Sequence, residues 1–298
     1  MFAQIDQTDT AIALTATAIV PAMIAPAAIA TAPAAMPDHS YAVRPGRAEA
    51  AQRRRLQRDL TAAMATGSFV LHYQPRLSLE SGRQTGAEAR ISWLRQRHGL
   101  VSASAFLPLA EGAGLTAEIG GWMLHAACIE AAAWPGGAVS VAVSPRQLVD
   151  HVLSRQLAEA LDASSLEPER LELTLPESAL ATADTDALLL LSAIRDLGIG
   201  IAVDDFGAGV ASLSMLKRLP LTAMKLARPL VREVTTDWED AAIVRAVIET
   251  GHALGLCMVA DGIESELQRA FLARGGCDDG QGALFGHKLT AAALRASI

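Results

Sequence analysis

The sequence predicts an α/β fold of the (β/α)8, or TIM-like, barrel type. Two observations support this prediction. After Gly67, short apolar runs alternate with helical patterns, and charged or polar residues follow several of those runs. Repeated strand and helix units predict a parallel sheet, and about eight of them predict a closed barrel. The chain has 298 residues, which is long enough for one such domain.

The N-terminal residues differ in composition from the rest of the chain. The segment Ala11–Met36 is uncharged, rich in alanine and threonine, and interrupted by prolines. It is long enough to span a bilayer, but alanine and proline make a weak membrane helix, and Met1–Asp6 lacks the positive charge of a signal peptide. We favour a flexible Ala/Pro-rich extension over residues 1–47, and a membrane anchor is the alternative.

The barrel domain is predicted over residues 48–298. Its first helix is indicated by Leu56, Leu60 and Met64, which lie four residues apart. Later helical patterns cover Leu115–Trp134, Asp184–Leu197, Asp237–Leu254 and Glu264–Arg274. The apolar runs that predict strands are Phe69–Tyr73, Gly86–Trp93, Val139–Ser144, Leu171–Leu175, Ile199–Asp204, Thr222–Leu226 and Cys257–Ala260.

Composition excludes some classes of protein. Aromatic residues make up 4% of the chain and the formal net charge is -7, which argues against a nucleic-acid binder with a basic, ring-lined groove. Cys128, Cys257 and Cys277 have neither disulfide-framework nor zinc-site spacing. We interpret them as ordinary thiols of a protein in the reducing cytoplasm.

Polar residues stand at the ends of several predicted strands. Because parallel strands of a barrel end at the same mouth, these side chains are predicted to meet in one polar pocket. A single acid at a strand end can instead cap a loop, but several such positions favour a pocket. The residues are Glu88, Asp204, Asp205, Lys225, Asp261 and Gln281.

One loop carries a specific family resemblance. Asp204-Asp205-Phe206-Gly207-Ala208-Gly209 resembles the DDFGxG loop of EAL domains. Other matching segments follow the family order, among them Tyr73-Gln74-Pro75, Gly86-Ala87-Glu88-Ala89, Pro176-Glu177-Ser178 and Gln281-Gly282. The resemblance covers the chain from about Leu56 onward. It implies a barrel whose first strand runs antiparallel and whose mouth binds cyclic di-GMP.

Active relatives hydrolyse cyclic di-GMP to pGpG with two Mg²⁺ or Mn²⁺ ions held by carboxylates. The resemblance places metal ligands at Glu88, Asp204, Asp205 and Asp261, the last in place of a glutamate. A ligand asparagine falls at Ala142 and a ligand glutamate at Thr174, so two ligands are missing. We therefore expect metal binding to be weak or absent.

The nucleotide positions implied by the resemblance are also altered. Gln74, Lys225, Glu264 and Gln281 match, and Lys225 is, with Glu88, a remnant of the catalytic set. Arg90 stands where the family has leucine. The arginine that usually touches the ligand phosphate, two residues later, is replaced by Ser92, and the aspartate two residues after Lys225 by Ala227. Arg90 is a candidate substitute for that arginine.

Two further substitutions fall in the loop after Asp205. Ala208 replaces a threonine and Val210 a tyrosine in the loop that links metal occupancy to dimer packing in the family. The resemblance still implies a homodimer.

These substitutions predict a degenerate EAL domain. It would act in cyclic di-GMP signalling as a nucleotide receptor or through a protein partner, and the changes at Arg90 and Ser92 favour the protein partner slightly. The alternative is a weak phosphodiesterase. A purely structural role, in which Asp204, Asp205 and Lys225 persist as a buried ion-pair network, also stays open.

Overall fold

The strands form a nine-stranded sheet in the order β1-β9-β8-β7-β6-β5-β4-β2-β3, and an additional β1 to β2 pairing closes eight of them into a barrel. The computed structural model describes residues 47–95, 99–149, 152–182, 184–207 and 213–297. Their strands are β1 (Phe69–Ser78), β2 (Gln84–Arg95), β3 (Gly99–Ser102), β4 (Ala138–Ala142), β5 (Leu171–Pro176), β6 (Gly200–Phe206), β7 (Ala223–Leu226), β8 (Cys257–Asp261) and β9 (Asp279–Gln281).

The first strand runs against its neighbours. β1 is antiparallel to both β2 and β9, whereas the strands from β4 to β9 are parallel to one another and β4 is parallel to β2. β3 is a short antiparallel addition to the far end of β2. The predicted barrel with an antiparallel first strand is therefore confirmed.

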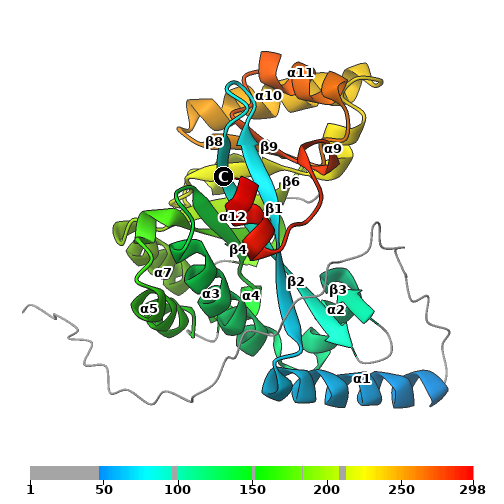
Figure 1. The fold of residues 1–298 in the computed structure, drawn as a ribbon. Coiled ribbons are helices and arrows are strands. Elements are labelled where there is room, and N and C mark those ends of the chain that lie inside the picture. Colours follow the sequence, from blue (N-terminus) through cyan, green and yellow to red (C-terminus); the bar gives the residue numbers. More distant parts are fainter. Residues whose placement is uncertain (1–46, 96–98, 150–151, 183, 208–212, 298) are drawn as a thin grey trace, which may run out of the picture. The chain divides into compact units, whose positions relative to one another are not determined.

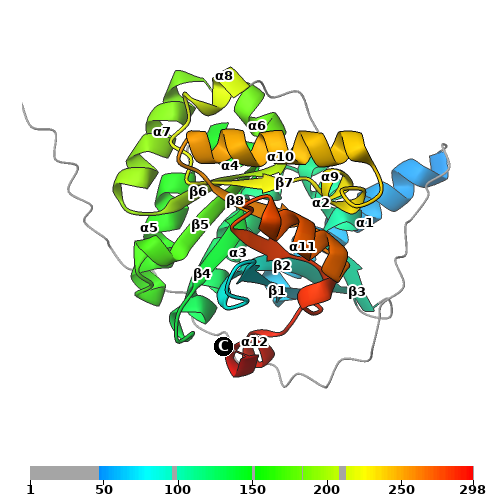
Figure 2. The same ribbon diagram turned by 90° about the horizontal axis from the view of Figure 1, so that it is seen from above.

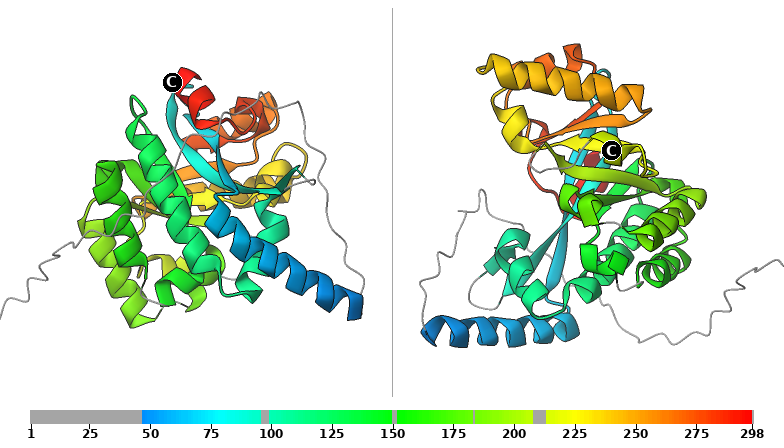
Figure 3. Two further views of the ribbon diagram at one scale, coloured as in Figure 1. Left: turned by 60° about the horizontal axis from the view of Figure 1, so that its bottom comes forward. Right: turned by 180° about the vertical axis from the view of Figure 1, so that it is seen from behind.

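Helices surround the strands, with α7 against β6 and α10 against β8 (Figure 2). The longer ones are α1 (Arg47–Thr66), α2 (Ala103–Gly112), α3 (Thr116–Ala132), α5 (Leu153–Ser164), α7 (Thr185–Asp196), α10 (Trp238–Ala253) and α11 (Glu266–Arg274). The shorter ones are α4 (Pro145–Val149), α6 (Glu177–Thr182), α8 (Leu213–Leu216), α9 (Arg228–Arg232) and α12 (Ala291–Ser297), with the 3-10 turns η1 (Pro168–Arg170) and η2 (Ala283–Phe285). α1 lies beside α2 (Figures 1 and 3).

Local sequence explains where several helices begin. The side chain of Asp237 accepts hydrogen bonds from the backbone N–H groups of Glu239 and Asp240, and that of Asp184 accepts one from Ala187. Ser265 forms a capping box with Gln268. These bonds satisfy N–H groups that have no partner within their own helix, so each helix starts at a fixed residue.

The parallel strands are covered on both faces. All four residues of β7 and five of the six residues of β5 are buried, as expected when side chains fill the barrel and helices cover its outside. Gly86 lets β2 and β4 approach closely, since a Cβ there would lie 2.4 Å from the carbonyl oxygen of Ala138.

A buried ion-pair network closes the end of the barrel where the parallel strands begin. Arg76 Nη1 lies 2.7 Å from Glu172 Oε1, and Arg76 Nε lies 3.4 Å from Asp279 Oδ2. Ser140 donates to the same oxygen of Glu172, and Thr85 donates to Asp279. We call these five residues the floor network. It lies opposite the strand ends that carry the predicted site.

The structure adds two strands that the apolar pattern missed, β3 and β9. The predicted extension, residues 1–47, lies outside the described residues except for Arg47, and so do Ala208 and Val210. Within the described ranges, no helix is long and apolar enough to cross a membrane. The segment Ala11–Met36 lies outside those ranges, so the anchor stays an alternative.

Candidate functional site

Glu88 is the centre of a buried polar cluster at the strand ends. It projects from β2 and is 8% exposed. Its Oε2 atom accepts hydrogen bonds from Lys225 Nζ at 2.8 Å, from Gln281 Nε2 at 2.6 Å and from Arg90 Nη2 at 3.2 Å. Three donors from three strands therefore converge on one carboxylate oxygen.

Lys225 joins Glu88 to Asp204 on the far side of the barrel. Its ammonium group lies 2.9 Å from Asp204 Oδ1, and the residue is 2% exposed. Burial alone would lower the pKa of Lys225, but Glu88, Asp204 and Asp261 outweigh it and raise the pKa above its ordinary value. Lys225 is therefore a permanent cation inside this cluster.

Arg90 makes a second link across the mouth. Its Nη2 atom is 3.2 Å from Glu88 Oε2 and 3.5 Å from Asp261 Oδ2. Gln281 bridges the same two acids, because its Nε2 also donates to Asp261 Oδ1 at 3.1 Å. We call Arg90, Glu88 and Asp261 the Arg90 bridge.

The charges around Glu88 decide its ionisation. Burial raises the pKa of a carboxyl group, but Lys225, Arg90 and the hydrogen bonds from Lys225 and Gln281 overcome that effect and lower the pKa of Glu88 to about 2. Glu88 is therefore ionised and neutralised by the protein's own cations at neutral pH.

Asp205 differs from Asp204 in exposure and backbone conformation. It is exposed and has a left-handed backbone with φ of 54°, and β6 departs from regular pairing with β7 between Val203 and Phe206. Its backbone N–H donates to Asp204 Oδ1 at 3.1 Å. Partial burial and the neighbouring Asp204 raise the pKa of Asp205. The two adjacent acids thus have different environments.

Ala142 and Thr174 of the neighbouring strands carry no charge. Ala142, the last residue of β4, is exposed and pairs in register with Thr174 of β5. Thr174 is fully buried, and its Oγ1 has no hydrogen-bond partner in the part of the chain that the structure describes. These two positions therefore lack the carboxylate and amide oxygens that a hard divalent ion prefers, whereas the buried Glu177, directly after β5, accepts a hydrogen bond from the backbone N–H of Gly207.

Comparison with known proteins decides the family. The sequence pattern of the EAL domain matches residues 56–288. The chain belongs to the EAL domain family. The Pseudomonas aeruginosa protein named bifunctional diguanylate cyclase/cyclic di-GMP phosphodiesterase MucR is 40% identical over 257 residues, covering 84% of this chain and 37% of MucR. Cyclic di-GMP phosphodiesterase NbdA of the same organism is 33% identical over 250 residues, covering 82% of this chain and 32% of NbdA. This chain therefore spans about a third of the length of these relatives.

Solved structures agree with this assignment. The MucR phosphodiesterase in complex with cyclic di-GMP superposes with a TM-score of 0.76 at 39% identity, covering 80% of this chain and 99% of that one. The FimX EAL domain from P. aeruginosa bound to cyclic di-GMP gives a TM-score of 0.73 at 25% identity, covering 78% and 96%.

The remaining EAL positions have mixed surroundings. Gln74 donates to the carbonyl oxygens of Gly282 and Gly286 and so holds the turn after β9. Glu264 lies at the rim, where it is paired with Arg228 at 3.2 Å and its side chain is 53% exposed. Ala227 is fully buried. The structure brings together Glu88, Arg90, Asp204, Lys225, Asp261 and Gln281, whereas Glu264 and Gln74 contact other groups.

The sequence pattern missed two cations of the mouth, Lys288 and Arg228. Lys288 is exposed, and its pKa is lowered by partial burial, by Arg90 and, less strongly, by Arg228, whereas Glu88 acts in the opposite direction. Like charges are therefore held near one another on this side of the mouth. Neither residue lies in a strand, and Lys288 follows the turn after β9, so no periodic pattern marks it.

The two-metal site of active EAL domains does not fit these residues. Within the described ranges, no group of three His, Cys, Asp or Glu side chains is arranged to hold a metal ion. Glu88 and Asp261 are already contacted by Arg90, which stands where the family has leucine. A divalent ion would have to displace that cation as well as find ligands in place of Ala142 and Thr174.

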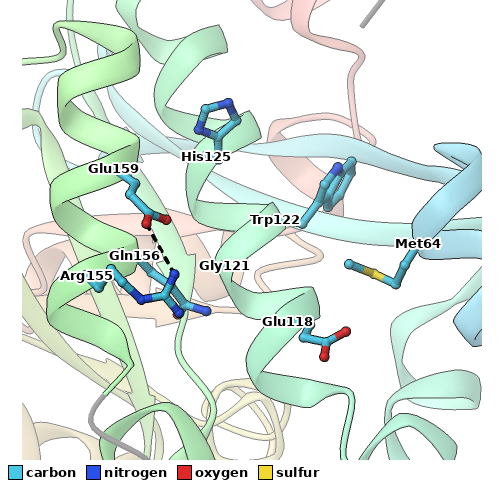
Figure 4. A pocket seen from close by; sticks show the side chains of 8 residues that line it. All are labelled: Met64, Glu118, Gly121, Trp122, His125, Arg155, Gln156 and Glu159. Atoms are coloured by element: carbon cyan, nitrogen blue, oxygen red, sulfur yellow. Dashed lines mark hydrogen bonds and ion pairs between the residues drawn. The ribbon is translucent and has the colours of Figure 1, made fainter. Parts of the chain in front are cut away.

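A separate hollow of about 360 Å³ lies on the outer helices, away from the strand ends. Figure 4 shows Trp122 and Met64 at one side of it and the exposed Arg155 and Glu159 pair at the other. Its lining comes from α1, α3 and α5 and mixes apolar, acidic and basic groups. That mixture indicates no particular ligand.

Proposed function

We propose that this EAL domain acts in cyclic di-GMP signalling by binding the nucleotide, with hydrolysis slow or absent. The observation that carries the proposal is the Arg90 bridge together with the Lys225 contacts to Glu88 and Asp204. Arg90, which stands where the family has leucine, pairs with two of the acids that metal-dependent hydrolysis would need. The contribution of a second metal ion is typically worth several kcal/mol, so turnover without it falls by orders of magnitude.

The nucleotide is proposed as ligand for two reasons. Related EAL domains, those of MucR and FimX, have been solved with cyclic di-GMP. Arg90, Arg228 and Lys288 also place positive charge at the mouth, and cyclic di-GMP carries two phosphate groups. Ser92 carries no charge and binds a phosphate less well than the arginine that it replaces. Arg90 and Lys288 are therefore the candidates to bind that phosphate.

A binding domain without turnover must pass its state to another molecule. We propose that a protein partner, or a second copy of this chain, recognises the nucleotide-bound form. The free thiols fit a reducing compartment, since Cys128 and Cys277 are buried and Cys257 is partly buried. We therefore propose a cytoplasmic protein with an extension over residues 1–47 and the barrel over residues 48–298.

Slow phosphodiester hydrolysis is the second candidate. Asp204 and Asp205 are adjacent at the end of β6, Asp205 is exposed, and the relatives MucR and NbdA are named as cyclic di-GMP phosphodiesterases. Such an activity would use fewer metal ligands than active EAL domains do.

Two measurements on the purified 298-residue chain test the proposal. Calorimetric titration with cyclic di-GMP is expected to give saturable binding with a dissociation constant below about 10 µM. Incubation with cyclic di-GMP and Mn²⁺, followed by chromatography, is expected to leave the nucleotide intact. Formation of pGpG that disappears in Asp204→Ala would establish the phosphodiesterase instead. Absence of any heat of binding would exclude the nucleotide as ligand and leave the protein partner.

A further inference from the structure

The Arg90 bridge spans the interior of the barrel. Glu88 lies on β2 and Asp261 at the end of β8, and the sheet order places β1 and β9 between those strands. Their carboxylates are nevertheless close enough for one nitrogen, Arg90 Nη2, to lie 3.2 Å from one and 3.5 Å from the other. A positive charge thus lies between two acids that face each other across the mouth.

Arg90 is held at the mouth by its contacts with two carboxylates. Its Nη2 atom lies near both Glu88 and Asp261, whereas its buried Nε atom has no hydrogen-bond partner among the described residues. Arginine keeps its charge at every pH at which the protein is folded. The positive charge in the bridge is therefore independent of pH and of metal supply.

We propose that Arg90 is a built-in cation that excludes a divalent metal ion from Glu88 and Asp261. The reasoning is chemical: a metal ion binds carboxylate lone pairs, and Arg90 and Gln281 direct N–H groups at those lone pairs. A metal would have to displace a charge that cannot leave by losing a proton. Arg90 thereby determines whether this half of the mouth holds a metal ion. The inference deepens the proposed function, but its test uses no nucleotide.

The test compares Mn²⁺ binding by wild type and variants, measured by the electron paramagnetic resonance signal of free Mn²⁺. Arg90→Leu is expected to gain one Mn²⁺ per chain with an affinity at least about tenfold above that of wild type, because Glu88 and Asp261 both lose the cation between them, although Lys225 still pairs with Glu88. Adding Asp261→Ala to Arg90→Leu is expected to abolish the gain. The matched control is Arg228→Leu, which removes the same charge at the rim and should behave as wild type.

Two outcomes would overturn the inference: Arg90→Leu that binds Mn²⁺ no better than wild type, or Arg228→Leu that gains as much. Circular dichroism checks that each variant is folded. Should Arg90→Leu fail to fold, Arg90→Gln carries the same test, because its amide can still donate to one acid while its charge is removed. Failure of cyclic di-GMP binding would affect only the proposed function, since these samples contain no nucleotide.

Discussion

The ionisation of Glu88 predicts the effect of replacing it with glutamine. Glu88→Gln keeps the size of the side chain and removes its charge. The difference between the ordinary pKa of 4.5 and about 2 in the folded protein corresponds to about 3 kcal/mol of folding stability at neutral pH. For a domain of this size that is roughly 6–12 °C in Tm. Stability is expected to decrease because Lys225 and Arg90 each lose the carboxylate charge of Glu88 as a partner.

The dependence on pH has a definite sign. A carboxyl group whose pKa is lower in the folded state stabilises the fold above its unfolded pKa, and that stabilisation is lost as the pH falls through the folded pKa. The difference between wild type and Glu88→Gln should therefore be complete above about pH 5. It should shrink to roughly half at pH 3 and vanish near pH 2 and below.

The assay is urea unfolding followed by circular dichroism at pH 7, 5 and 3. The matched control is Glu264→Gln, a rim residue whose side chain is 53% exposed, which should change stability by less than about 1 kcal/mol. If Glu88→Gln is as stable as wild type at pH 7 and its stability depends on pH in the same way, Glu88 is not an ionised carboxylate that Lys225 and Arg90 stabilise.

Three other variants test separate parts of the structure. Arg76→Met leaves two buried acids of the floor network without their cation, so the free energy of unfolding in urea should fall by about 3–5 kcal/mol. Calorimetry should find an unchanged affinity for cyclic di-GMP. A variant as stable as wild type would contradict the prediction. Lys288→Ala should weaken the binding of cyclic di-GMP by roughly fivefold in calorimetry and make that binding less dependent on salt concentration. An unchanged affinity would exclude a contact between Lys288 and the phosphate. The triple variant Ala142→Asn, Thr174→Glu, Arg90→Leu should form pGpG on chromatography. The double variant that keeps Arg90 should not, and equal product from both would refute the role of the arginine.

The sequence was sufficient for most of the barrel. Apolar runs such as Leu171–Leu175 and Cys257–Ala260 lie in strands β5 and β8, because strands buried on both faces leave an unambiguous signal. β9 was missed because Asp279–Gln281 is short and polar, and its pairing with β1 and β8 defines it as a strand. The antiparallel first strand followed from the family resemblance, since periodicity does not report strand direction.

The sequence indicated which residues gather at the strand ends but not which of them contact one another. Glu88, Lys225 and Asp261, chosen for their strand-end positions, lie in one cluster of contacts, while their role in ligand or metal binding stays a prediction. The contact between Arg90 and Asp261 joins residues 171 positions apart, and only the closed barrel brings them together. Burial of the floor network was also unpredicted, because Arg76 and Asp279 give no signal of their partners in the sequence.

Arg90 is proposed to take the place of a metal ion at this mouth. Calorimetric titration of wild type with cyclic di-GMP, in excess EDTA and again in Mn²⁺, tests it most directly. Saturable binding with the same dissociation constant is expected in both buffers. Binding that is detected only with Mn²⁺ would refute the proposal, because the nucleotide would then require an ion that Arg90 is proposed to replace.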